Sequence, residues 1–174
     1  MKQGEKGFTN LELIVAIAII ALVGGATTAA IFQVFKSAER NNDHMTAVSQ
    51  VQNAGYWISR DTLMAQNVTA TDNLTPPNFL VLNWVEESSG DEYQVVYTLE
   101  NMPDGELKKL HRIRSINGGS SNTTLVAQYI DPNPEKTKCE LANGVLSLTV
   151  TAMVSDHSPA ESETRTYQVV PRPG

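Results

Sequence analysis

The chain has 174 residues and a formal net charge of -6, from 13 lysines and arginines against 19 aspartates and glutamates. This length suits one modest globular domain with an extension, not two large domains. The acidic balance and the sparse basic clusters argue against nucleic acid as the main partner of that domain. Cys139 is the only cysteine, which excludes an intrachain disulfide, and we interpret it as an incidental thiol.

The N-terminal part of the chain combines a short polar segment with a long apolar one. Residues 1–7 include Lys2 and Lys6, and in the apolar stretch from Leu11 to Phe35 the only formal charge is Glu12. About 20 apolar residues cross the hydrocarbon core of a bilayer, so this stretch is long enough to span it. Positive charge before the stretch and none directly after it predicts a cytoplasmic N-terminus. We therefore expect a single-pass protein of the inner (cytoplasmic) membrane whose C-terminal domain lies outside the cytoplasm.

The order of residues before the apolar stretch differs from that of an ordinary secretory signal. A glycine and a phenylalanine precede the stretch, where the usual signal peptidase would not cut, and cleavage there would keep the whole apolar helix. Gly7, Phe8, Thr9 and Glu12 resemble the class III signal of type IV prepilins and pseudopilins. The resemblance implies that a prepilin peptidase removes the leader, residues 1–7, by cutting between Gly7 and Phe8, and that Phe8 becomes N-methylphenylalanine.

Glu12 is the residue in this segment that most needs a physical explanation. A carboxylate within a membrane span costs roughly 2.5–3.5 kcal/mol on insertion scales. The resemblance implies that Glu12 pairs with the N-terminal amine of Phe8 in a neighbouring subunit, with Thr9 beside it in the assembly contact. Thr9-Asn10-Leu11-Glu12 is also a capping box that satisfies amides at a helix start, and the two roles are compatible. A signal-anchored protein outside any filament would explain the span but not the register of these residues.

The helix is expected to continue well beyond the membrane. Gly24 and Gly25 are expected to interrupt the helix, and the pair is either a hinge or a contact between packed helices. We predict a transmembrane and filament-core half over residues 8–35 and an amphipathic half over residues 36–68, ending near Asn67. The amphipathic stripe takes in Ile31, Val34, Ala38, Met45, Val48 and Val51.

Residues 69–174 are expected to form a β-rich globular domain. After Pro76-Pro77 the periodicity changes to that of strands, without further helices, which predicts an antiparallel sheet on the amphipathic helix and an α+β fold. Pro103-Asp104-Gly105 is a strong hairpin signal, and 87–91 and 117–122 are further turns. The predicted strands are Phe79–Val85, Tyr93–Leu99, Leu107–Ile116, Thr124–Ile130, Val145–Val154 and Thr164–Val170.

Within the family, the helix end is similar to that of two kinds of subunit. Trp57 to Asp61, followed by Ala65 to Val68, resembles minor pilins of the W type and J-type minor pseudopilins of type II secretion. The resemblance implies a non-enzymatic structural subunit of a type IV pilus or a secretion pseudopilus, with a prepilin peptidase, sibling subunits and membrane lipid as partners. A binding module displayed at a filament tip, which recognises DNA or a surface, is the alternative. Trp57 itself is interpreted as a core residue.

Other chemical groupings carry less weight. His44, His111 and His157 are scattered and have no ligands at metal spacing, so no metal site or cofactor is expected. Some pseudopilins bind calcium in a late loop, but the acidic loops 131–140 and 156–163 show no compelling ligand spacing. The segment from Lys108 to Arg114 is rich in basic residues, which favours a charged edge strand, with contact to DNA or an acidic partner as the alternative.

Overall fold

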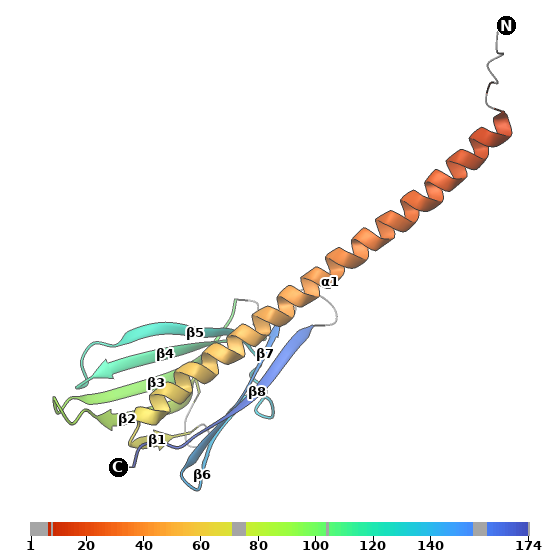
Figure 1. The fold of residues 1–174 in the computed structure, drawn as a ribbon. Helices are drawn as coiled ribbons and strands as arrows, with labels where there is room; N and C mark the ends of the chain where they lie inside the picture. The colour runs from red at the N-terminus through yellow and green to blue at the C-terminus, as the bar shows by residue number, and fades with distance from the viewer. Residues whose placement is uncertain (1–6, 8, 71–75, 104, 155–159, 174) are drawn as a thin grey trace. The chain divides into compact units, whose positions relative to one another are not determined.

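The computed structural model describes residues 7, 9–70, 76–103, 105–154 and 160–173. Within them lie one helix and eight strands that form one curled antiparallel sheet, ordered β1-β2-β3-β4-β5-β7-β6, with β8 on the free side of β7 (Figure 1). The predicted α+β fold, a long N-terminal helix packed against an antiparallel sheet, is confirmed. The elements are α1 (Asn10–Met64), β1 (Asn67–Thr69), β2 (Asn78–Val85), β3 (Glu92–Asn101), β4 (Lys108–Ile116), β5 (Asn122–Ile130), β6 (Lys138–Ala142), β7 (Val145–Val154) and β8 (Glu161–Val169).

The chain divides into two compact units between Asn41 and Asn42. In the first unit α1 stands without a covering layer, and its apolar side chains are exposed. In the second unit the remainder of α1 packs on the sheet. The side chains it buries there are Ala47, Val51, Ala54, Gly55, Ile58, Asp61 and Thr62.

The buried stripe of α1 differs from the expected one. Met45 was predicted to face the core, but 67% of it is exposed. Three of the buried positions are instead small residues, Ala47, Ala54 and Gly55. Their size allows strands to lie close to the helix backbone. The helix ends at Met64, not near Asn67, since Asn67 already pairs with Asn83 of β2.

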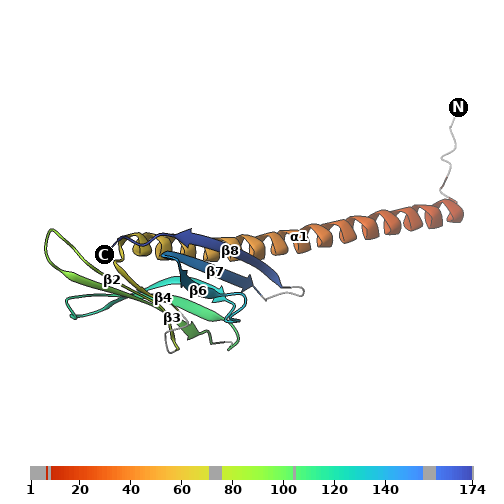
Figure 2. The same cartoon turned by 90° about the horizontal axis from the view of Figure 1, so that it is seen from below.

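In the second unit α1 lies along one face of the curled sheet (Figure 2). Strands β2 to β5 lie on one side of the helix and β7 and β8 on the other (Figures 1 and 2). The two parts of the sheet meet at one residue pair, Ile130 of β5 and Ala152 of β7. The core between sheet and helix includes Leu80, Leu82, Val95, Tyr97, Leu110, Ile130, Leu146, Leu148 and Val150.

All six predicted strands are present, with ends that differ by three residues or fewer. The hairpin predicted at Pro103–Gly105 joins β3 to β4, although Asp104 lies outside the described residues. Strands β1 and β6 were not predicted. β6 is only five residues long, and it becomes a strand by pairing with β7 through a two-residue turn, in which Asn143 and Gly144 have φ of 52° and 77°.

Candidate functional site

The start of α1 holds the residues that the sequence assigns to processing and assembly. Gly7 is exposed, and Phe8 lies outside the described residues. Thr9 precedes the helix, and its carbonyl oxygen accepts a 3.2 Å hydrogen bond from the amide of Leu13. Thr9 is therefore the N-cap of α1.

Thr9 and Glu12 form the predicted capping box. The Thr9 amide and hydroxyl donate to Oε2 of Glu12 at 3.1 Å and 3.0 Å. The Glu12 amide donates in return to the Thr9 hydroxyl at 3.3 Å. Both bonds to the carboxylate use Oε2, so Oε1 has no hydrogen-bond partner among the described residues. This second oxygen can accept a donor from outside the chain.

The apolar surface around this carboxylate is continuous. From Leu11 to Phe35 the large apolar side chains are between 49% and 73% exposed. An 18-residue window of α1 has a mean hydropathy of 2.4 and no buried residue, so the helix is long and apolar enough to cross a membrane. A shallow apolar hollow of about 380 Å³ lies further along the same stretch, lined by Thr27, Ala30, Ile31, Val34 and Phe35.

The glycine pair does not break the helix. α1 is continuous through Gly24 and Gly25, so the expected interruption is absent here, and both the hinge and the helix contact stay predictions. The hydroxyls of Thr27 and Thr28 donate to the carbonyls of Val23 and Gly24, each at 2.8 Å. These bonds satisfy the two hydroxyls within the helix. A Cβ on either glycine would have no neighbour within 4 Å, which leaves room for a second helix.

At the other end of α1 a buried ionic cluster joins the helix to the sheet. Asp61 accepts hydrogen bonds from Arg112 Nε at 2.6 Å and Nη2 at 3.1 Å, and from the Tyr97 hydroxyl at 2.6 Å. Burial, and then the negative charge of Asp61, raise the pKa of Tyr97. Trp57 is partly buried against the core, as predicted, and Arg60 and Arg112 lie over its ring at 5.4 Å and 5.2 Å.

Two members of this cluster, Asp61 and Tyr97, were missed from the sequence. A charged residue within an amphipathic helix is predicted to be exposed. The partners of Asp61 lie 36 and 51 positions away in the sequence, so no local pattern indicates that it is buried. Because its charged groups are paired with one another between the helix and the sheet, we assign the cluster to holding the helix on the sheet.

The basic segment is not an edge strand, so that prediction is wrong. It forms β4, which lies between β3 and β5 in the interior of the sheet. Arg112 is paired with Asp61, and Arg114 lies 4.9 Å from the centre of the Tyr93 ring. These two arginines make contacts within the domain.

The remaining candidate groups are separate from one another. Among the described residues no three His, Cys, Asp or Glu side chains gather closely enough to hold a metal ion, and His157 lies outside them. Asp131, in the first acidic loop, is paired with Lys136 at 2.8 Å. Cys139 is fully buried, and burial, then the charge of Glu140, raise the pKa of its thiol to about 12. This thiol stays protonated and unreactive at neutral pH.

Comparison of the chain with protein-family models, with curated proteins and with solved structures finds no match. Its functional assignment therefore depends on its own residues.

Proposed function

We propose that this chain is a minor pilin or pseudopilin, a structural subunit of a type IV pilus or of a type II secretion pseudopilus. The observation that carries the proposal is the carboxylate of Glu12, one residue into an exposed apolar surface that runs to Phe35. Gly7, Phe8 and Thr9 precede it in the register of a prepilin signal. In this proposal a prepilin peptidase cuts after Gly7 and the new N-terminus at Phe8 is methylated.

The environment of Glu12 supports pairing between subunits. A charge at this depth costs roughly 2.5–3.5 kcal/mol, and an opposite charge offsets that cost. The free amine of Phe8 in a neighbouring subunit is such a charge, because N-methylation leaves it basic. Oε2 of Glu12 caps its own helix through Thr9, whereas Oε1 has no partner among the described residues. One carboxylate can therefore cap one helix and bind the terminus of the next.

The apolar part of α1 supports association with other helices. Before assembly the inner membrane covers this surface, and after assembly sibling helices cover it. The hollow formed by Thr27, Ala30 and Ile31 lets a second apolar helix approach the backbone closely.

The alternative readings have less support. A tip module that binds DNA needs a basic surface, but Arg112 is paired with Asp61 and Arg114 lies over the ring of Tyr93. A bitopic anchored domain outside a filament gives no reason for an acid at the fifth residue after Gly7. A surface ligand has a specific structural basis in the second unit, which is considered below.

Two measurements test the proposal. The intact mass of the protein extracted from membranes should correspond to a chain that starts at Phe8 and carries one added methyl group. Retention of Met1 in the working protein would contradict the assignment.

The second measurement separates capping from pairing. Glu12→Gln keeps an oxygen that accepts from Thr9, and glutamine is compatible with a capping box, but the negative charge is lost. We expect Glu12→Gln to be processed normally and to enter sheared filaments about tenfold less than the native chain. Thr9→Ala is the companion variant: it removes the hydroxyl that caps the helix and keeps the charge of Glu12, so incorporation should fall much less. Equal incorporation of Glu12→Gln and the native chain would refute the pairing role.

A further inference from the structure

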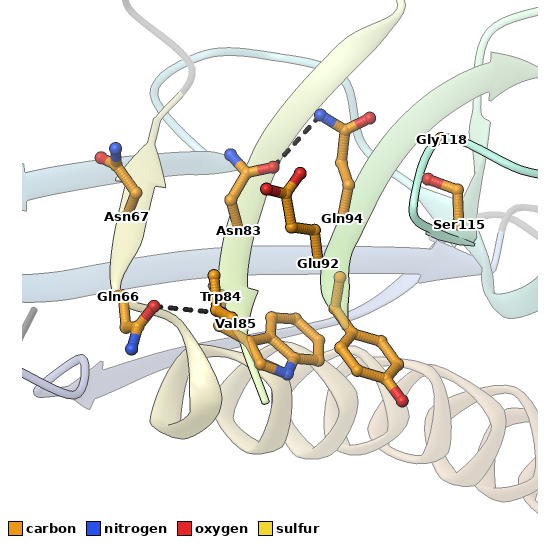
Figure 3. A pocket seen from close by; sticks show the side chains of 10 residues that line it. Gln66, Asn67, Asn83, Trp84, Val85, Glu92, Gln94, Ser115 and Gly118 are labelled. Carbon is orange, nitrogen blue, oxygen red and sulfur yellow. Dashed lines mark hydrogen bonds between the residues drawn. The ribbon is translucent and has the colours of Figure 1, made fainter. Parts of the chain in front are cut away.

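A row of amide and hydroxyl side chains crosses four strands of the sheet. Asn67 of β1 is opposite Asn83 of β2, Asn83 is opposite Gln94 of β3, and Gln94 is opposite Ser115 of β4. Because neighbouring strands lie about 4.8 Å apart, the row is about 14 Å long. Figure 3 shows Asn67, Asn83 and Gln94 projecting away from α1, while Trp84 lies on the helix side. Glu92, two residues before Gln94, projects to the same side as the row.

The row lies in a depression of about 630 Å³. This volume is within the range of about 300–1,000 Å³ that is usual for small-molecule sites. The depression is lined by Gln66, Asn67, Asn83, Trp84, Val85, Glu92, Tyr93, Gln94, Ser115 and Gly118.

Most of the hydrogen-bonding capacity of the row is unused. Gln94 Nε2 donates to Asn83 Oδ1 at 3.1 Å, which fixes the two amides and leaves the Asn83 NH₂ and the Gln94 carbonyl for a ligand. Asn67, Glu92 and Ser115 have no side-chain hydrogen bond to the rest of the described chain. An amide both donates and accepts, and so does each hydroxyl of a sugar.

The walls of the depression are held in place by contacts that a ligand would not disturb. Gln66 Oε1 accepts from the Val85 amide at 3.0 Å, and Asn117 Oδ1 accepts from the Glu92 amide at 2.8 Å. On the helix side the rings of Trp84 and Tyr93 stack at 5.3 Å and 6°. A site held in this way loses little conformational freedom on binding.

The charge of the lining narrows the ligand class. The ten lining residues include no lysine, arginine or histidine, so phosphate groups and nucleic acid have no counter-charge here. One carboxylate, Glu92, is the only acid, and alone it is a poor cation site. From this chemistry we propose that the depression binds a neutral oligosaccharide, with Asn83 and Gln94 at its centre and Glu92 accepting from vicinal hydroxyls. Binding at this site does not depend on filament assembly. The oligosaccharide would be the surface ligand of the exported domain.

The test uses the full chain in a zwitterionic detergent, because glycoside detergents would compete. It is applied to an array of neutral glucans, galactans and mannans, with sialylated glycans, heparin and duplex DNA as anionic probes. We expect binding to at least one neutral glycan and none to the anionic probes. Asn83→Ala and Gln94→Ala should each raise the Kd about fivefold, and the double variant should raise it about tenfold or more.

Gln168→Ala is the matched control, since Gln168 is an exposed amide on β8, outside the depression. It should bind as the native chain does. Tryptophan fluorescence of each variant shows whether the domain is folded, because Trp57 and Trp84 both lie in it. Absence of binding to every neutral glycan, preference for an anionic probe, or equal loss in Gln168→Ala would each overturn the proposal. None of these results depends on whether the chain enters a filament.

Discussion

The contact between Gly55 and Tyr167 allows a sharp test of how β8 is held on the helix. A Cβ at position 55 would lie 2.2 Å from Tyr167 Cζ and 2.4 Å and 2.5 Å from the two Cε atoms. Ordinary contact begins at 3.4 Å, so the ring would have to move by about 1.2 Å (3.4 − 2.2). The ring is not free to move, because its hydroxyl donates to the carbonyl of Val51 at 3.1 Å.

Two effects of Gly55→Ala oppose each other. Overpacking costs about 1–3 kcal/mol, and losing the hydrogen bond of the Tyr167 hydroxyl costs about 0.5–1.5 kcal/mol more. Replacing glycine by alanine within a helix stabilises it by about 0.8–1 kcal/mol. We expect a net destabilisation of about 1–3 kcal/mol in the native background.

The sign should reverse when the ring is absent. In the Tyr167→Ala background the clash disappears, so Gly55→Ala should stabilise the domain by about 1 kcal/mol. The assay is urea unfolding of the full chain in detergent, followed by tryptophan fluorescence. Asn53→Ala, at an exposed position of the same helix, is the control and should have a small effect in both backgrounds. A Gly55→Ala effect of the same sign in both backgrounds would refute the reasoning.

Three further predictions concern the charged and titrating groups of the domain. Asp61→Ala leaves the Arg112 guanidinium buried without its partner and should cost about 3–5 kcal/mol in urea unfolding, whereas a double variant with Arg112→Met should be less destabilised than the single one. The pKa of Cys139 is about 12 in the folded state and about 9 in the unfolded state. The contribution of the thiol to the free energy of unfolding is therefore complete below pH 9 and is lost between pH 9 and 12. Cys139→Ala should make the free energy of unfolding depend less on pH in this range. Burial would raise the pKa of Asp131, but hydrogen bonds from Lys136 and from the amide of Asn133 outweigh burial and lower the pKa. The stabilising contribution of Asp131 is therefore present above its unfolded pKa of 3.8 and is lost as the pH falls through the lower folded pKa. Lys136→Met should reduce this loss of stability in acid, and an unchanged dependence of unfolding on acid pH would contradict the prediction.

The strands and the capping box could be predicted because their signals are local. Alternating residues in β7 mark a half-buried strand, and Thr9 and Glu12 sit three positions apart, the spacing of reciprocal capping. β6 could also have been found, since Asn143-Gly144 is a strong hairpin signal that fixes the strand before it.

The features that were missed depend on partners far along the chain. The position of β4 in the interior of the sheet follows from its pairing with both β3 and β5, not from its own charged residues. The burial of Asp61 depends on Arg112, and the exposure of Met45 follows from which side of α1 the strands approach. The amide row requires the register of four strands, which periodicity alone does not give.

The attachments between α1 and the strands have a mechanical consequence. Gln50 accepts from the amide of Gln128 in β5, the Val51 carbonyl accepts from Tyr167 in β8, and Asp61 binds Arg112 in β4. Tension along the helix axis would thus be divided among three strands. Losing any single attachment would leave the other two to hold the helix on the sheet.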